Sequence, residues 1–384
     1  MESVFDKIVA FIRVKYNNPD SLISLHDPRF YGNEKKYLNE CIETTFVSSI
    51  GKFVTRFEEM IMEYTGAKHA IATVNGTAAL HIALLLCNVK PEDEVITQPL
   101  TFIATANAIT YTGAKHVFID VDPETLGLSP KSLKTFLEEN TFMDKGFCIN
   151  KVSGRRIKAC VPMHTFGHPC RIDEIVTICK EYNIDVVEDA AESLGSWFKK
   201  QHTGTFGKFG TLSFNGNKII TTGGGGMILT DNDELGKLAK HVTTTAKIPH
   251  RWEFNHDMIG YNYRLTNLAA ALGCAQMEQL PDFIDKKRHL AEDYYAFLKE
   301  LGIMLFTEPV NCSSNYWLNT LIFESITAQK SFLEFMNDHH VMARPVWTLM
   351  NKLEMYKSSQ CGSLRNAEWL SERIVNIPSS VIFS

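Results

Sequence analysis

The chain has 384 residues, about enough for one large domain and a smaller companion. Hydrophobic residues make up 45% and charged residues 22%, values typical of globular proteins, which exclude a disordered or fibrous chain. The net charge of -5 provides no bulk attraction to nucleic acid or to an anionic membrane. We therefore expect neither as a partner.

The start of the chain, residues 1–16, predicts a short amphipathic helix, because charged residues interrupt its apolar positions where a signal peptide would be uninterrupted. The most apolar stretch, residues 78–87, is too short to cross a bilayer and predicts a buried helix. The nine cysteines are an odd number without a C-x-x-C pair. We expect a reduced, cytoplasmic chain without a metal centre.

Helical and extended segments alternate through the first half of the chain. After an irregular opening over 17–33, apolar residues at helical spacing predict a helix from about Phe53 to Gly66. Strands are then predicted at 69–74, 94–97, 116–120, 157–163 and 184–187, and helices at 77–87, 101–111 and 172–182. This alternation predicts an α/β fold, in which helices cover both faces of a mostly parallel sheet.

A second region begins after Gly260. Helices are predicted at 265–280, 281–301 and 329–338, with a final helix near 366–375, and extended segments at 317–323 and 341–346. This mixture predicts a smaller α+β domain. We expect a large domain over 1–260, which includes an N-terminal segment of residues 1–50, and a small domain over 261–384.

The first motif that could bind a ligand is Asn75-Gly76-Thr77-Ala78, between an apolar strand and an apolar helix. Free N–H groups at a helix start, a glycine that permits close approach and a threonine hydroxyl suit a phosphate. The alternative is an ordinary turn with Thr77 as the N-cap of the helix.

The second motif is Asp189, at the end of the strand Ile184–Val187 and its extension. A carboxylate at this position lies at the carboxyl edge of a parallel sheet, where ligands of open α/β folds bind. Burial there makes a cationic partner necessary. The alternative is a carboxylate that caps a helix.

The third motif is Lys218, which lies between a small polar loop and two isoleucines and is followed by the glycine run 223–226. Partial desolvation of a lysine favours the neutral amine, which is the nucleophile. The alternative is a surface lysine beside a flexible loop. A strand is predicted after the glycines, at 227–230, so the run is not a dinucleotide-binding fingerprint.

Together, the three motifs supply the parts that hold pyridoxal phosphate. A lysine forms the Schiff base, a carboxylate keeps the ring nitrogen protonated, and a glycine-threonine turn binds the phosphate. Phe102, which follows a predicted strand, could stack on the cofactor ring, although a core phenylalanine is the alternative.

The sequence also resembles a known family. The segments that carry the resemblance are 75–80, 101–108, 188–191, Ser213-Phe214 with Lys218, and 260–264. They are similar to the sugar aminotransferases of the DegT/DnrJ/EryC1/StrS family, which are fold-type-I enzymes dependent on pyridoxal phosphate. Residues 30–34 and 48–51, together with Glu192 and Gly224, resemble the branch that makes 4-amino sugars for bacillosamine and legionaminic acid.

The resemblance implies a role for each matching residue. Lys218 would be the catalytic lysine, and Arg264 would lie beside the substrate in the neighbouring subunit of a homodimer. The implied cofactor-binding residues are Gly76, Thr77 and Ser213 at the phosphate, Asp189 at the ring nitrogen, Phe102 on the ring, Glu192 near the ring hydroxyl, and Asn262 from the neighbouring subunit. Most of the family has Gln or His where this chain has Glu192, and Glu where it has Gly224.

His164 and His168 could pair as metal ligands, but no third ligand is indicated nearby, so we expect structural or pocket-wall roles. Arg344 and Trp347 could face the substrate or pack in the core. The resemblance implies transfer of an amino group from L-glutamate to C4 of a UDP- or GDP-linked 4-keto-6-deoxy-N-acetylhexosamine. The alternatives are transfer at C3, dehydration on the same fold, and a noncatalytic nucleotide-sugar-binding protein.

Overall fold

The computed structural model describes residues 4–383. Its central sheet contains β1 (His69–Thr73), β2 (Glu94–Thr97), β3 (Lys115–Phe118), β6 (Ile157–Val161), β7 (Asp185–Asp189), β10 (Phe209–Ser213), β11 (Gly226–Thr230) and β16 (Gln360–Cys361). The strand order is β1-β11-β10-β7-β6-β2-β3-β16. β11 runs antiparallel to both of its neighbours, and the other neighbouring pairs are parallel. The mostly parallel sheet predicted from the alternation of elements is confirmed.

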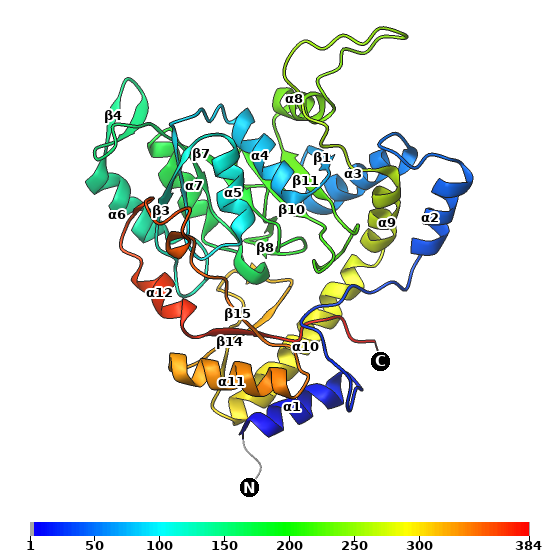
Figure 1. The fold of residues 1–384 in the computed structure, drawn as a ribbon, viewed down its shortest axis with the longest axis vertical. Helices are drawn as coiled ribbons and strands as arrows, with labels where there is room; N and C mark the ends of the chain where they lie inside the picture. The colour runs from blue at the N-terminus through cyan, green and yellow to red at the C-terminus, as the bar shows by residue number, and fades with distance from the viewer. Residues whose placement is uncertain (1–3, 384) are drawn as a thin grey trace.

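Helices cover both faces of this sheet (Figure 1). One face carries α4 (Gly76–Leu86), α5 (Ile103–Tyr111) and α8 (Asp233–Thr243), and the other carries α3 (Lys52–Thr65), α6 (Pro130–Asn140), α7 (Ile172–Glu181) and α9 (Asn267–Met277), with α2 (Glu34–Glu43) packed on α9. Successive strand residues face opposite layers: Val186 packs with α7 and Val187 with α4. Both faces are apolar because both are covered.

A second, antiparallel sheet has the order β12-β14-β17-β15. Its strands are β12 (Met304–Leu305), β14 (Asn319–Ile322), β15 (Arg344–Pro345) and β17 (Ile374–Ile377). The long helix α10 (Leu280–Glu300), α11 (Ile326–Asp338) and α1 (Val4–Lys15) share one apolar core with it. Figure 1 shows these elements together, with α1 and α11 at the end of the molecule opposite α8.

Residues from both sides of position 260 contribute to the same apolar cores. α1 packs with the C-terminal elements, whereas α9 and β16 join the large core and the large sheet. The division into 1–260 and 261–384 stays a prediction, and the packing joins the two regions at several points.

The remaining elements are short. They are β4 (Thr141–Asp144) and β5 (Phe147–Asn150), β8 (Trp197–Phe198), β9 (Gln201–His202) and β13 (Cys312–Ser313), the single turns Thr165–Gly167 and Met350–Lys352, and α12 (Arg365–Ser371). The helix predicted near 366–375 is wrong in its second half, since Ile374 and Val375 pair with β14. Their β-branched side chains favour a strand over the end of a helix.

Within residues 4–383, no helix combines the length and the apolar character needed to cross a membrane.

Candidate active site

A cavity of 340 Å³ lies at the carboxyl ends of the parallel strands. Seven segments far apart in the sequence line it. Most of them follow strands of the large sheet, because parallel strands deliver the residues that follow them to the same edge. Seven residues predicted from the sequence meet there: Gly76, Thr77, Phe102, Asp189, Glu192, Ser213 and Lys218. The predicted motifs therefore form one site.

The start of α4 forms one wall of the cavity. The side chain of Asn75 caps this helix by accepting a hydrogen bond from the N–H of Ala78 at 2.7 Å. The cap is thus Asn75 and not Thr77. The hydroxyls of Thr77 and Ser213 make no hydrogen bond with any other residue in 4–383, so both are available to a ligand. A Cβ on Gly76 would lie 3.0 Å from that of Ser213, closer than most Cβ contacts, so glycine favours the close approach of the two segments.

Asp189 is buried at the end of β7. Its Oδ2 accepts a hydrogen bond from the hydroxyl of Thr105 at 2.6 Å, and its Oδ1 accepts one from the N–H of Ala191 at 3.2 Å. Burial raises the pKa of the Asp189 carboxyl, and the Thr105 hydrogen bond opposes that shift. A cationic N–H in the cavity would stabilise its ionised form. Thr105 lies in the motif 101–108, but the sequence does not reveal its contact with Asp189.

Lys218 is held between a carboxylate and an aromatic ring. Its Nζ lies 3.2 Å from Oε1 of Glu192 and 4.0 Å from the centre of the Trp317 ring. The indole N–H of Trp317 donates to the carbonyl of Asn217 at 2.6 Å, which fixes the ring beside the lysine loop. Sequence reasoning missed Trp317, because a single tryptophan before a strand has no motif around it.

The glycine run brings two backbones close together. A Cβ on Gly226 would lie 2.5 Å from the carbonyl carbon of Asn75, and a Cβ on Gly225 would lie 2.2 Å from Oγ1 of Thr222. Space is open around Gly224. Gly226 therefore allows β11 to pack beside the start of α4, and Gly225 leaves room for Thr222, whereas no steric reason excludes a side chain at Gly224.

Aromatic residues form the mouth of the cavity. The ring of Phe102 is 45% exposed and meets the Trp347 ring edge-on at 6.0 Å between centroids. A phenylalanine exposed to this extent at a cavity wall is not a core residue. Both rings present apolar faces to the site, which suits stacking against a planar ligand.

Asn262 and Arg264 lie outside this cavity. Arg264 donates to the side-chain oxygen of Asn262 at 3.4 Å, and the backbone of their segment pairs with Thr73 and Val74. The segment ends the long loop after α8, which projects from the body of the molecule (Figure 1). Within one chain, these two side chains do not join the other seven.

The two predicted structural histidines are buried. His164 accepts the Cys170 N–H at Nδ1 and therefore carries its proton on Nε2, 3.0 Å from Glu188. Burial lowers the pKa of His168 to about 3, and its ring packs edge-on against Phe306 and Tyr316. Among residues 4–383, no group of three potential metal ligands is present.

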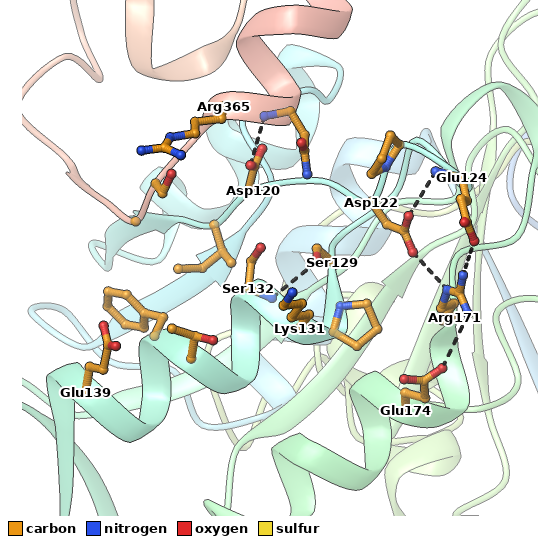
Figure 2. Close-up of a pocket in the computed structure, with 18 of the residues that line it drawn as sticks. Asp120, Asp122, Glu124, Ser129, Lys131, Ser132, Glu139, Arg171, Glu174 and Arg365 are labelled. Atoms are coloured by element: carbon orange, nitrogen blue, oxygen red, sulfur yellow. Dashed lines mark hydrogen bonds and ion pairs between the residues drawn. The ribbon is translucent and has the colours of Figure 1, made fainter.

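A larger cleft of 660 Å³ lies between the start of α6 and the start of α12 (Figure 2). Figure 2 shows ion pairs at one side of the cleft, where Arg171 contacts Asp122, Glu124 and Glu174. It contains none of the predicted site residues. Its volume alone does not make it the functional site.

Comparison with known proteins identifies the class. Residues 29–384 match the model of the DegT/DnrJ/EryC1/StrS aminotransferase family, and the chain belongs to this family. It is a pyridoxal-phosphate-dependent aminotransferase with the fold of that enzyme class.

Individual relatives share most of their length with this chain. It is 37% identical over 357 residues to the GDP-perosamine synthase of Escherichia coli O157:H7, with 93% of both chains covered. It is 37% identical over 364 residues to a putative pyridoxal phosphate-dependent aminotransferase, EpsN, of Bacillus subtilis strain 168, covering 93% of this chain and 90% of the relative. The aminotransferase TlmJ from Streptoalloteichus hindustanus superposes with a TM-score of 0.84 at 26% identity, over 94% of each chain.

The cavity fits pyridoxal phosphate in its chemistry. Free hydroxyls and a helix start suit the phosphate, the buried carboxylate of Asp189 suits a protonated ring nitrogen, and Lys218 offers an amine. When bound, the cofactor supplies the electron sink for amino transfer.

Proposed function

We propose that this enzyme transfers the amino group of L-glutamate to C4 of a nucleotide-linked 4-keto-6-deoxy-N-acetylhexosamine carried on UDP or GDP. The product would serve a pathway of the bacillosamine or legionaminic-acid type. Support comes from the relatives named GDP-perosamine synthase. Further support comes from Glu192 and Gly224, which resemble the branch that makes 4-amino sugars for bacillosamine and legionaminic acid.

The observation that carries the proposal is the convergence of seven predicted residues in one cavity. In the proposed reaction, Lys218 binds the cofactor and later carries a proton between cofactor and substrate carbons. Asp189 holds the proton of the ring nitrogen, and Phe102 stacks on the ring. Gly76, Thr77 and Ser213 bind the phosphate.

We also propose that the active unit is a homodimer. Asn262 and Arg264 lie outside the cavity of their own chain, on a loop whose side chains Ile248, Trp252, Phe254 and Ile259 are exposed. Exposed apolar residues in this number suit burial against a second copy. In the dimer, Asn262 would reach the phosphate of the neighbouring site, and Arg264 would lie beside its substrate.

Three other functions are alternatives to amino transfer at C4. Amino transfer to C3 would use the same residues with a shifted sugar, and a dehydratase would use the same fold. Lys218 favours amino transfer over dehydration, because related dehydratases have histidine at the matching position. A noncatalytic nucleotide-sugar-binding protein would keep the fold without reacting with glutamate.

The test is an assay of the two half-reactions. Glutamate is expected to remove the yellow colour of the purified enzyme, and a UDP- or GDP-linked 4-keto sugar is expected to restore it, with the 4-amino sugar detected by mass spectrometry. Amination at C3, or pyruvate as a far better acceptor than any keto sugar, would contradict the substrate assignment. An enzyme whose colour does not respond to glutamate would contradict amino transfer.

A further inference from the structure

Glu192 is a carboxylate in an unusual setting, at the floor of the cavity. Its side chain is 1% exposed, and that of Lys218 is 11% exposed. Oε2 accepts the backbone N–H of Phe166 at 2.9 Å, and Oε1 accepts from Nζ of Lys218 at 3.2 Å. Each carboxylate oxygen thus has one hydrogen-bond partner. The ammonium group of Lys218 can transfer a proton, whereas the backbone N–H of Phe166 cannot.

The backbone around Glu192 is fixed by an uncommon turn. Phe166 adopts a left-handed conformation with φ 57°, which directs its N–H at the carboxylate. At Gly167, φ is 95° and a Cβ would lie 1.9 Å from Oδ1 of Asn315. The side-chain nitrogen of Asn315 in turn donates to the carbonyl of Glu192 at 2.9 Å. These contacts hold the carboxylate at one position relative to Lys218.

The surrounding charges leave Glu192 near the balance between its two protonation states. Burial raises its pKa to about 7, the nearby Lys218 opposes this shift, and the Asp189 carboxylate adds to it. The His164 ring hydrogen-bonds Glu188, and its charge opposes the rise in the pKa of Asp189. Lys218 is among the cations that lower the pKa of His26 in the N-terminal segment. Burial and neighbouring cations lower the pKa of His26, so His26 adds no competing charge near neutrality.

From this geometry we propose that Glu192 is the acid–base partner of Lys218, which accepts a proton from the ammonium group before the amine reacts and returns it afterwards. The inference rests on the proposed role of Lys218. One N–H bond breaks at Nζ and one O–H bond forms at Oε1, while the electron pair stays on nitrogen as the nucleophile. The transfer exchanges an ion pair for two neutral groups, which a buried site favours.

The comparison with glutamine, one of the two residues that most of the family has at this position, makes the inference specific to Glu192. A glutamine can accept a hydrogen bond from Lys218 but cannot take its proton. If Glu192 only positioned the lysine, glutamine would serve equally well. The Glu192→Gln variant therefore separates positioning from proton transfer without changing the size of the side chain.

The experiment follows the capture of pyridoxal phosphate by the full-length chain after its cofactor has been removed. The visible absorbance that develops on Lys218 gives a rate, measured between about pH 5 and 9. In the wild type, Glu192 already holds a proton below its pKa of about 7, so the rate is expected to rise as the pH increases through that value. Glu192→Gln should lose the rise near pH 7, keep only the dependence that comes from direct loss of the Lys218 proton to water, and be about a hundredfold slower near neutral pH.

Two further variants complete the test. Glu192→Asp keeps an acid and should keep a rise in rate, which provides a second reading if the glutamine variant does not fold. Asp185→Asn is the matched control, because Asp185 lies at the other end of β7 and pairs with Lys158 at 2.5 Å, outside the cavity. It should keep the wild-type profile.

A Glu192→Gln variant with the wild-type rate and pH profile would overturn the inference. So would an aspartate variant with no pH-dependent rise. The proposed function fails separately: a wild type that captures the cofactor with the expected profile but aminates no nucleotide sugar would contradict only the substrate assignment.

Discussion

The cavity at the strand ends and the cleft in Figure 2 both contain lysine or arginine beside carboxylates, but they differ in exposure and pairing. In the cleft, Arg171 is 41% exposed and Glu124 is 73% exposed, and the arginine is shared among three carboxylates. In the cavity, Asp189 is buried, and its carboxylate has a hydroxyl and a backbone N–H as its hydrogen-bond partners among residues 4–383. Exposed pairs contribute little, whereas a buried and incompletely paired carboxylate is costly without a ligand.

The comparison teaches that the volume of a hollow is a weak guide to function. The cleft has a volume of 660 Å³ and the cavity 340 Å³, yet the seven predicted site residues meet only in the smaller one. The buried carboxylate of the cleft, Asp120, already accepts the N–H groups of Asn366 and Ala367. Matched substitutions in the two places can test this difference.

The largest expected difference in activity is between variants of Lys218 in the cavity and Lys131 in the cleft. Lys218→Ala should reduce amino transfer by at least about a thousandfold, because alanine can neither form an imine nor carry a proton. The variant should remain folded and still hold the cofactor non-covalently. Lys131→Ala in the cleft should retain the wild-type rate in the same assay. Multiple turnovers by the Lys218 variant near the wild-type rate would contradict the comparison.

The second contrast concerns two aspartates. Asp189→Asn should lower kcat about a hundredfold without unfolding the protein, because an amide cannot pair with a protonated ring nitrogen. Asp122→Asn weakens a contact to Arg171 that is 2.8 Å long, half-exposed on the arginine side and outside the cavity, so kcat should be unchanged. Steady-state rates and melting curves of both variants measure this. Equal kcat values for the two variants would make Asp189 a structural residue.

The third contrast compares cofactor affinity after substitution of Gly76 in the cavity and of Gly362 in the cleft. Gly76→Ala should weaken cofactor affinity about tenfold, because the new Cβ would lie 3.0 Å from that of Ser213 and obstruct the presumed phosphate position. Gly362→Ala in the cleft meets its nearest atom at 3.5 Å, an ordinary contact, and should bind the cofactor like the wild type. Titration of the cofactor by absorbance gives both affinities, and an unchanged value for Gly76→Ala would remove the turn from the site.

The fourth prediction asks whether the cavity is complete within one chain. Lys218→Ala and Arg264→Ala should each be inactive alone, but a mixture in equal amounts should regain about a quarter of the wild-type activity, since half of the dimers contain one intact site. Subunit exchange must be shown by mass spectrometry. Exchange without recovery would mean that Arg264 does not serve the neighbouring site.

The sequence could predict the site residues that follow strands of the large sheet, but not those that reach the site from the second sheet. Gly76, Asp189 and Ser213 each follow or end a strand of a parallel sheet, so their convergence follows from the order of elements. Trp317 reaches Lys218 from the segment before β14, which belongs to the second sheet. That contact depends on how the two sheets pack, and no local pattern contains this information.

The errors in the predicted elements include α6 and β17. The helix α6 is not among the predicted elements, although Leu133, Phe136 and Leu137 lie at helical spacing and Ser129 caps its start. The predicted helix over 366–375 runs into the first half of β17, because only two residues separate α12 from this strand. Pairing with β14, a long-range contact, decides its structure.

The smallest expected effect belongs to Asp120, which contacts the cleft but serves stability. Its two carboxylate oxygens accept the N–H groups of Asn366 and Ala367, at 2.9 and 2.8 Å, and thereby satisfy the start of α12. Asp120→Asn keeps one acceptor and loses the charge that favours a helix start, so unfolding should require about 1–2 kcal/mol less. Because α12 lies outside the cavity, kcat per folded molecule should be unchanged. Chemical denaturation measures the first quantity and steady-state kinetics the second. A variant of Asp120 that lost kcat at unchanged stability would mean that the cleft in Figure 2 takes part in the reaction, and the distinction between the two hollows would fail.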